Sequence, residues 1–239
     1  MIEKAKKKDG SMPDQNAQLD ARERLIRAAV EIFAENGFNA TTTRMLADRA
    51  QANLSAIPYY FKSKEGLYLA AVEHITDVLS ARLDPFLNRL AHLTTGGGPD
   101  PEAARALIGE GLATMVAVMC GDPATLPFSK IILLEQMAPT AAFEMIYPKI
   151  MERILSAFAA LIAATTGEDD PRQCNLQAIL LVGQVMVFRA GRATATRRLA
   201  MEGYTPAEVA EIQEAVVSRA MAALDYMTAR RRRSKDRSS

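Results

Sequence analysis

Residues 41–67 read TTTRMLADRAQANLSAIPYYFKSKEGL, and this stretch holds two short helical patterns separated by a tight break. Thr42 is placed to cap the free backbone N–H groups of the first pattern. The break falls at 50–52, and Asn53 is a suitable cap for the second pattern. Two short helices joined by a turn of this length predict a helix-turn-helix, whose second helix enters the major groove of DNA.

The same spacing also fits a corner between two helices of an ordinary bundle. In that alternative Tyr59, Tyr60 and Phe61 are core residues, and Phe61 is expected in the core under both interpretations. In the DNA-binding interpretation, the hydroxyls of the threonines and tyrosines and the ammonium of Lys64 are suitable phosphate ligands. Spacing alone therefore leaves both interpretations open.

The composition of the 239 residues is that of a globular, helix-rich protein. Hydrophobic residues make up 49% and charged residues 24%, with no tryptophan, and no sustained β alternation is visible. The lysine-rich start lacks the apolar segment of a signal peptide, and no run of 18 apolar residues occurs, so a cytoplasmic protein without a membrane span is expected. Cys120 and Cys174 are expected as buried thiols, with a disulfide as the alternative.

Charge is distributed unevenly along the chain although its net value is +1. The net charge is +2 over 1–66, −6 over 67–229 and +5 over 230–239. Positive ends flanking an acidic middle fit a polyanionic partner at one end, and they equally fit two solvated tails. The N-terminal lysines could track DNA beside the helix-turn-helix as a basic arm, whereas the C-terminal RRRR run is read as a solubilising tail.

Helix starts are easy to locate in this sequence. Asp20 with Glu23 predicts the start of a first helix that ends at Gly37, and a fourth helix is expected behind Ser63. Four further starts pair a capping side chain with a proline at the first helical position. These are Asp100-Pro101, Asp122-Pro123, Asp170-Pro171 and Thr205-Pro206. With a further helix between the second and third of them, the expected segments are about 101–120, 125–137, 140–166, 171–201 and 205–230. The predicted fold is all-α with about nine helices, comprising a flexible arm at 1–19, a three-helix DNA-binding domain at 20–66, a larger helical domain at 67–229 and a tail at 230–239.

The run GFNATTTRMLADRAQANLSAIPYYFKSKEGLYLAAVE at 37–73 resembles the N-terminal domain of the TetR family of dimeric transcriptional regulators. The runs LLEQMAPTAAFEMIY at 133–147 and LLVGQVMVFRAGRATATRRL at 180–199 resemble the C-terminal domain of its CecR-like branch, as does NLSAI at 53–57. The resemblance implies a ligand-responsive homodimer, expected to be a repressor that binds a palindromic operator. It also implies the roles of ten residues. Thr42, Thr43 and Arg44 would hold phosphates or reach a base edge; Asn53, Leu54, Ser55 and Ala56 would face the groove; Tyr59, Tyr60 and Lys64 would hold the DNA backbone.

Two residues depart from the family pattern. Gln51 stands where many helix-turn-helix units have glycine, in a turn that can require positive φ, so a strained or altered turn is expected. Pro58 lies inside the second helix, where an unaccommodated proline costs about 3 kcal/mol and bends the helix.

Residues 176–199 are apolar on several faces, which indicates burial on several sides. The segments 171–201 and 205–230 are therefore predicted to pair with their symmetry mates in a four-helix dimer interface, with a purely intramolecular core as the alternative. The residues expected at that interface are Leu176, Leu180, Gly183, Val187, Gly191, Val209, Ile212, Val216, Ala220 and Leu224.

Polar and adaptable side chains within apolar surroundings predict a pocket for a small apolar or aromatic molecule that releases the protein from DNA. Ordinary core packing is the alternative for its apolar members, and an ion pair with Glu135 or Glu144 is the alternative for Arg189. The expected lining residues are Met115, Met119, Phe128, Gln136, Met137, Phe143, Tyr147, Phe158, Gln184 and Arg189.

Catalysis is not expected. The only histidines, His74 and His92, have no ligand spacing, and no nucleophile, phosphate-loop, dinucleotide or metal motif is present, so no cofactor is expected. The remaining alternative is an architectural protein that binds DNA without sequence preference, which predicts steep salt dependence and little discrimination between DNA sequences.

Overall fold

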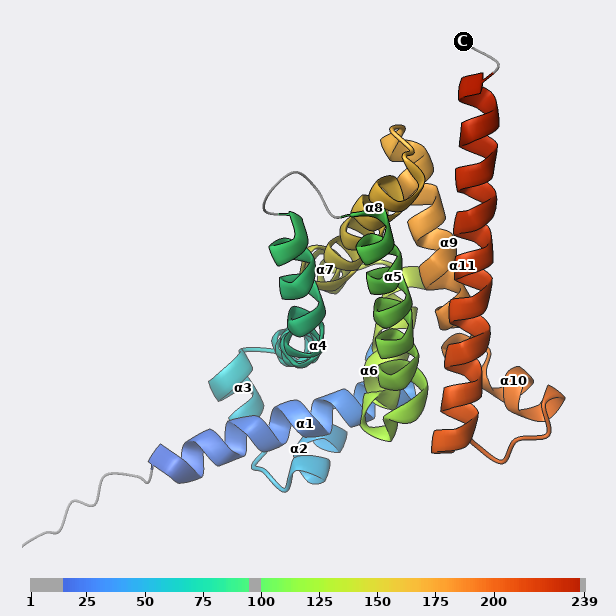
Figure 1. Ribbon diagram of the computed structural model, residues 1–239. Coiled ribbons are helices and arrows are strands. Elements are labelled where there is room, and N and C mark those ends of the chain that lie inside the picture. Colours follow the sequence, from blue (N-terminus) through green and yellow to red (C-terminus); the bar gives the residue numbers. More distant parts are fainter. Residues whose placement is uncertain (1–14, 95–99, 237–239) are drawn as a thin grey trace, which may run out of the picture. The chain divides into compact units, whose positions relative to one another are not determined.

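The computed structural model describes residues 15–94 and 100–236, and every regular element in these ranges is a helix, which confirms the all-α class (Figure 1). The chain divides into two compact units between Ala71 and Val72, within helix α4. The first unit contains α1 (Gln15–Ala40), α2 (Thr43–Ala50), α3 (Ala56–Phe61) and the start of α4 (Lys64–Thr94).

The second unit continues with α4 and contains all later elements. They are α5 (Pro101–Val116), the π-helix η1 (Ala117–Gly121), the short 3-10 helix η2 (Pro123–Thr125), α6 (Leu126–Met137), α7 (Ala141–Ile146), the π-helix η3 (Tyr147–Met151), α8 (Glu152–Thr166), α9 (Pro171–Ala190), α10 (Arg192–Arg198) and α11 (Pro206–Asp236).

The helix count exceeds the predicted nine because two segments expected as single helices are subdivided. The segment 140–166 contains α7, η3 and α8, and the segment 171–201 contains α9 and α10, which meet at Gly191. The expected tail also differs, since α11 continues through the arginine run to Asp236. Most of the predicted arm at 1–19 lies outside the described residues.

Four helix starts in the second unit are capped as the sequence predicts. The carboxylates of Asp100, Asp122 and Asp170 accept hydrogen bonds from backbone N–H groups two or three residues on, at 3.2, 2.9 and 2.9 Å. At the fourth start, Thr205 N–H donates to Glu208 Oε2 (2.6 Å) and Glu208 N–H donates to Thr205 Oγ1 (3.3 Å). Hydrogen bonding from Thr205 to the carboxylate, chiefly from its backbone N–H, lowers the pKa of Glu208 because it favours the ionised form.

The first helix starts earlier than predicted. It begins at Gln15, not behind Asp20, because no glycine or proline lies at 15–20 to stop a helix there. Gly37, its predicted end, has a non-helical φ of 74° and ψ of 170°, so the regular helix is interrupted at that residue, although α1 extends to Ala40 beyond the kink.

The core of the first unit forms where α1, α2, α3 and the start of α4 meet. The rings of Phe33, Phe38 and Tyr68 cluster with centroids 4.9 to 5.9 Å apart. Phe61, expected in the core, is buried. The other large buried side chains of this unit are Leu25, Ile26, Val30, Ile32, Leu46, Ile57 and Leu67.

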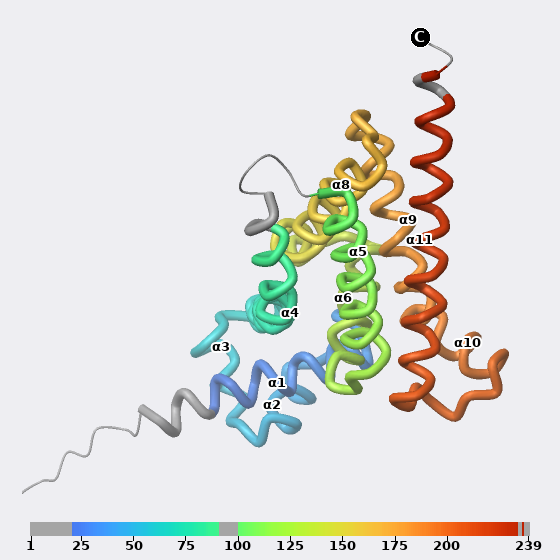
Figure 2. Tube along the Cα trace, in the orientation of Figure 1, coloured from blue at the N-terminus to red at the C-terminus, as the bar shows by residue number. Residues whose placement is uncertain are grey.

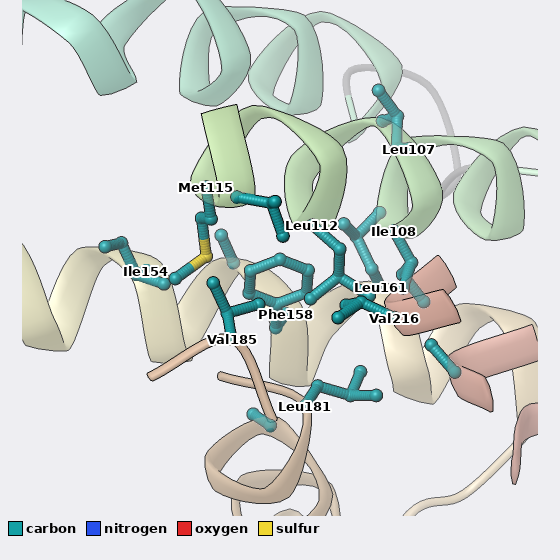
Figure 3. Close-up of a cluster of buried hydrophobic side chains, with 14 of the residues drawn as sticks. Leu107, Ile108, Leu112, Met115, Ile154, Phe158, Leu161, Leu181, Val185 and Val216 are labelled. Atoms are coloured by element: carbon teal, nitrogen blue, oxygen red, sulfur yellow. The ribbon is translucent and has the colours of Figure 1, made fainter. Parts of the chain in front are cut away.

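The core of the second unit lies between α5, α8, α9 and α11, and α11 packs along α5 and α8 (Figure 2). Phe158 sits in the middle of this cluster, between Leu112 and Met115 of α5 and Val185 of α9 (Figure 3). Pro101–Gly121 is the one described helix that is long and apolar enough to cross a membrane by length and composition. It is a core helix here, because Leu107, Ile108, Leu112 and Met115 all belong to the buried cluster.

Candidate nucleic-acid interface and internal cavity

The predicted helix-turn-helix of the first unit consists of α2, α3 and the turn between them. Thr42 Oγ1 accepts a hydrogen bond from Met45 N–H (3.2 Å), as its predicted role as a cap requires. Gln51 ends α2 with a φ of 49°, which confirms the expected left-handed turn residue. Its N–H group donates to Asp48 O (3.2 Å), so the turn is closed although a glycine is absent.

The second helix begins later than predicted. Asn53 does not cap it directly; the Asn53 side-chain carbonyl accepts from the N–H (3.0 Å) and the hydroxyl (2.9 Å) of Ser55. This closed side-chain turn competes with helix formation, so α3 starts at Ala56. The exposed side chain of Ser55 is thereby fixed at the start of the helix.

Pro58 does not break α3, contrary to expectation. It is the third residue of a helix that begins at Ala56, and N–H groups of the first turn have no partner inside the helix. The missing donor therefore removes no hydrogen bond, and Lys62 N–H still donates to Pro58 O (3.1 Å).

Two arginine side chains attach the α2–α3 pair to α1. Arg49 at the end of α2 pairs with Glu31 at 2.6 Å and with Glu35 at 3.5 Å. Arg24 Nε donates to Ala50 O (3.0 Å), one of the last carbonyls of α2. These contacts fix α2 in register against α1 from two sides.

Lys64 also holds the first unit together, and its expected role as a phosphate ligand stays a prediction. Its ammonium donates to Phe38 O (2.8 Å) and Thr41 O (2.9 Å) and lies 4.3 Å from the centroid of the Phe38 ring. The buried Thr41 hydroxyl donates to Gly37 O (2.7 Å) in the same part of the unit. Lys64 thus connects the start of α4 to the end of α1 and the residue that follows it.

The remaining predicted DNA-binding residues lie on the surface of this unit. Arg44 is exposed. Tyr59 and Leu54 are large apolar residues, yet 70% of Tyr59 and 48% of Leu54 is exposed. Tyr60 is half-buried and its ring meets that of Tyr59 edge-on, with centroids 4.8 Å apart. Among the other predicted residues, Thr42, Asn53 and Ser55 are exposed, and Thr43 and Ala56 are half-buried.

A surface hollow of about 610 Å³ joins the start of α2, the start of α3 and the loop before α4. Its lining residues include hydroxyl, amide and ammonium groups, which suit contact with phosphates and base edges. It also reveals two residues absent from the predicted set, Lys62 and Ser63, which are both exposed. Their signal in the sequence was the polar run between Phe61 and Leu67. The hollow is lined by Thr43, Asn53, Leu54, Ser55, Ile57, Pro58, Lys62, Ser63 and Lys64.

The second unit contains a cavity of about 420 Å³ with an apolar wall. Its lining comes from elements far apart in the sequence, and both π-helical segments, η1 and η3, contribute residues. Four methionines belong to the wall, and none of its side chains is charged at neutral pH. The lining residues are Leu79, Met115, Val118, Met119, Ser129, Ile132, Gln136, Phe143, Tyr147, Ile150, Met151, Ile154, Leu155, Ile179, Val182, Gly183 and Met186.

Five of the ten residues predicted for a pocket line this cavity, namely Met115, Met119, Gln136, Phe143 and Tyr147. The other five lie elsewhere. Phe158 is fully buried in the core cluster, Met137 is 76% exposed at the end of α6, and Phe128 packs edge-on against His74 with centroids 6.4 Å apart. Gln184 follows Gly183 by one position and therefore points about 100° further round α9, away from the wall.

Arg189 lies behind the cavity wall and does not line it. Its guanidinium donates to Ser129 Oγ (2.7 Å), to Met119 O (2.6 Å) and to Thr125 Oγ1 (3.3 Å). Burial lowers the pKa of Arg189 because it disfavours the charged form. Ser129 and Met119 both line the cavity, so Arg189 joins two wall segments to the end of α9. The ion pair considered with Glu135 does not form; Glu135 instead accepts from Thr140 N–H (3.0 Å).

The predicted interface residues separate into two groups. On α9, Leu176 (46% exposed), Leu180 (57%) and Val187 (58%) form an open apolar stripe with the exposed Gly183, next to the half-buried Gly191. The expectation for α11 was wrong, because its five residues belong to the intramolecular core and leave a different face of the helix exposed. Those five are Val209, Ile212, Val216, Ala220 and Leu224.

Both cysteines are free and buried, so the expectation of thiols is confirmed. Burial raises the pKa of Cys120 and of Cys174, which keeps both thiols protonated at neutral pH. Among the described residues, no group of three or more His, Cys, Asp or Glu side chains is arranged to hold a metal ion.

Comparison with known proteins assigns both units. Residues 25–71 match the family "Bacterial regulatory proteins, tetR family", and residues 104–227 match the C-terminal domain of "HTH-type transcriptional dual regulator CecR". The CecR protein of Shigella flexneri is 37% identical over 175 residues, which cover 73% of this chain and 78% of that protein. The regulator RutR of Escherichia coli K12 is 35% identical over 69 residues, 29% of this chain and 32% of its own.

Solved structures agree with this fold. A TetR-family regulator from Mesorhizobium loti aligns over 89% of this chain and 96% of its own, with a TM-score of 0.54 and 19% identity. The regulator FadR of Bacillus subtilis, solved with stearoyl-CoA, aligns over 82% and 95%, with a TM-score of 0.52 and 16% identity.

The two matched regions together define a class, that of bacterial helix-turn-helix regulators with a separate helical C-terminal domain. The chain belongs to the TetR family of transcriptional regulators, with a C-terminal domain of the CecR type. It is a DNA-binding regulator of transcription and not an enzyme.

Proposed function

We propose that the protein is a homodimeric repressor that binds a palindromic operator and is released from it by a small uncharged molecule. The observation that carries the proposal is the concentration of exposed polar and aromatic side chains around α2 and α3, fixed on α1 by buried and bordering contacts. Regulators of this family bind DNA and small molecules and act as dimers. Two copies would present two such faces to half-sites about one helical turn of DNA apart.

Within this face, Arg44, Lys62 and the hydroxyls of Thr42, Thr43 and Ser63 are proposed to contact phosphates. Asn53, Leu54, Ser55 and Ala56 are proposed to reach base edges, since they precede or begin the second helix of the motif. Tyr59 and Tyr60 would add contacts to sugar and phosphate. Lys64 is proposed to support this surface from behind through Phe38 and Thr41.

The chemistry of the cavity wall defines the proposed effector. Its volume of about 420 Å³ suits a molecule of drug or metabolite size, and its four methionines adapt to irregular apolar shapes. Only Ser129, Gln136 and Tyr147 offer polar side-chain atoms. A carboxylate or phosphate would lose its hydration without gaining a cation, so the effector is proposed to be uncharged and apolar or aromatic. The stearoyl-CoA of the FadR structure has phosphates that this wall would not pair with.

Release follows if the effector binds better to the conformation with lower DNA affinity. The Shigella relative is described as a dual regulator, so activation at some promoters is the alternative outcome for this chain. We propose a cytoplasmic location, where both the DNA and the free thiols of Cys120 and Cys174 would be expected.

Selection from a random pool of DNA duplexes tests the DNA-binding part of the proposal. The expected result is an enriched palindrome whose half-sites are separated by about one helical turn. Tyr59→Ala should lower affinity for that palindrome about tenfold, whereas Tyr226→Ala should leave it unchanged. Tyr226 is a matched control because it is 66% exposed, like Tyr59 at 70%, but lies on α11. Equal retention of all sequences would instead indicate an architectural DNA-binding protein.

A matched pair of dyes tests the effector class. N-phenyl-1-naphthylamine is uncharged, and 8-anilinonaphthalene-1-sulfonate adds a sulfonate to the same aromatic skeleton. The neutral dye should bind at least about tenfold more tightly and should lower the affinity for DNA. Val182→Phe, which places a ring in the cavity wall, should abolish binding of the neutral dye. Stronger binding of the sulfonate would contradict an uncharged effector.

A further inference from the structure

The cavity in the second unit has a side that is open to solvent within a single chain. Four of its lining residues are exposed: Gln136 on α6, Tyr147 at the start of η3, and Ile179 and Gly183 on α9. Ile179 is 54% exposed although it is a large apolar residue. The wall of the cavity is therefore incomplete on the side that these four residues line.

That edge continues into the apolar stripe of α9. At 100° per residue, Ile179, Val182, Gly183 and Met186 share the face toward the cavity, and Ile179 and Gly183 also border the stripe of Leu176, Leu180 and Val187. Tyr147, which also lines the cavity, is a further large residue with an exposed ring, at 42%. Exposed apolar residues grouped along one helix face and at the opening beside it mark a surface that another protein covers.

We propose that the second copy of the chain closes this cavity, so that each effector site is complete only in the dimer. The inference rests on the homodimer of the proposed function and adds that the partner supplies part of the wall. The occupant is the second copy because the stripe beside the opening lies on α9, and regulators of this family act as dimers. The exposed side of the cavity and the exposed side of α9 then become buried in one step.

In this arrangement dimer formation and effector binding are coupled. A molecule in the cavity would contact atoms of both copies, so occupancy would strengthen the dimer and dimer formation would strengthen binding by the same factor. Gly183 is the residue at which the two surfaces meet. A side chain placed there has open space in the isolated chain, since no atom lies within 4 Å of the position that a Cβ atom would take.

Thiol labelling of Gly183→Cys tests the closure directly. The substitution fits without repacking, and the native Cys120 and Cys174 are buried and give a low background. Leu199→Cys is the matched control, because Leu199 is 51% exposed at the end of α10 and lies outside both the cavity wall and the α9 stripe. Leu180→Glu, which alters the stripe but not the cavity wall, provides the monomer for comparison.

In a dimer verified by sedimentation, an uncharged maleimide should modify Gly183→Cys at least about tenfold more slowly than Leu199→Cys. Adding Leu180→Glu should give a monomer in which the two cysteines react at similar rates. Equal rates in the verified dimer would overturn the inference, and so would a Leu180→Glu variant that remains a dimer. The readout involves neither DNA nor effector, so either of these failures would leave the proposed DNA-binding function standing.

Discussion

The two units of this regulator carry their proposed functions in opposite ways. In the first unit, the residues proposed to act are exposed and close together in the sequence, and the buried residues hold them in place. In the second, the proposed site is a cavity whose wall comes from eight helical elements spread over residues 79–186. A surface built from one local motif can be recognised from spacing, whereas a cavity built from distant segments depends on packing that spacing does not reveal.

A substitution that destabilises only the first unit should have the largest effect and should distinguish the two units most clearly. Gly66 lies in the first turn of α4, and a Cβ atom there would come within 2.0 Å of Phe61 O, a backbone atom that cannot move away alone. Gly66→Ala should destabilise the first unit by about 3 kcal/mol and abolish DNA binding. Urea unfolding followed by circular dichroism, with a DNA-binding assay, measures both effects.

Gly109→Ala is the matched control in the second unit. Its Cβ would meet Val217 Cγ1 at 3.5 Å, an ordinary contact, so the change should be neutral or stabilise α5 by about 0.5 kcal/mol. Wild-type DNA affinity in the Gly66→Ala variant would contradict the packing described for α3 and α4.

The next test concerns two neighbouring lysines with different roles. Lys64→Met removes a cation that bonds to two carbonyls, so the first unit should lose about 2 kcal/mol of stability. Lys62→Met changes an exposed side chain, so stability should change by less than about 0.5 kcal/mol. Thermal unfolding of both variants measures the difference.

DNA binding gives the complementary result for the same pair. Lys62→Met should reduce the slope of log affinity against log salt by about one, because one phosphate contact is lost. If Lys64→Met instead kept full stability and showed this reduced salt slope, and Lys62→Met did not, Lys64 would be the phosphate ligand and Lys62 would not.

A smaller effect is expected at a helix start in the second unit. Asp122 accepts a hydrogen bond from Ala124 N–H (2.9 Å) and pairs with Arg82 (2.6 Å). The Ala124 bond, with a smaller contribution from Arg82, holds the pKa of Asp122 below its ordinary value of 3.8. The folded protein thus favours the ionised carboxylate, and this stabilisation is present above pH 3.8 and lost as pH falls through the lower folded value.

Asp122→Asn keeps a capping oxygen but removes the charge. It should lower stability by about 0.5 kcal/mol at pH 7, and the difference from the wild type should shrink below pH 3.8. Unfolding free energies measured from pH 7 to pH 3 test this, and a difference that grows on acidification would contradict it.

The smallest predicted effect is at the turn between α2 and α3. Gln51 has a φ of 49°, in the left-handed region that costs a non-glycine residue about 1 kcal/mol. Gln51→Gly should raise stability by about 0.5 kcal/mol, since greater freedom of the unfolded chain offsets part of the gain. Ala200→Gly is the corresponding change in the second unit, where φ is 55°. Denaturation midpoints of both variants should rise, and a fall at Gln51 would show that its side chain contributes more than its backbone strain removes.

The sequence predicted those features whose causes are local. The caps at Thr42, Asp100, Asp122 and Asp170 each depend on residues within three positions. The positive φ of Gln51 was expected from the family pattern, in which many members have glycine at this turn position. Local reasoning did not find the structural contacts of Lys64, because its partners Phe38 and Thr41 lie 26 and 23 positions earlier. It failed at Pro58 because the start of α3 was placed two residues too early.

In the second unit the same reasoning located apolar and methionine-rich helices, but it did not show which of their residues face the core and which line the cavity. Phe158 and Phe143 have the same chemistry, yet the first fills the core and the second lines the cavity. Arg189 was recognised as a polar residue in an apolar helix, but its partners on η1, η2 and α6 depend on three-dimensional packing. On α11, periodicity located an apolar stripe without showing that it faces the intramolecular core.

The most direct test of sequence-specific recognition is the ratio of affinities for two DNA duplexes of equal length at about 150 mM salt. One duplex carries the palindrome selected by the protein, and the other carries the same bases in shuffled order. Recognition by two copies predicts that the palindrome binds at least about 10³-fold more tightly, with one dimer per duplex. A ratio near one, with steep salt dependence for both duplexes, would contradict sequence-specific recognition by the α2–α3 face.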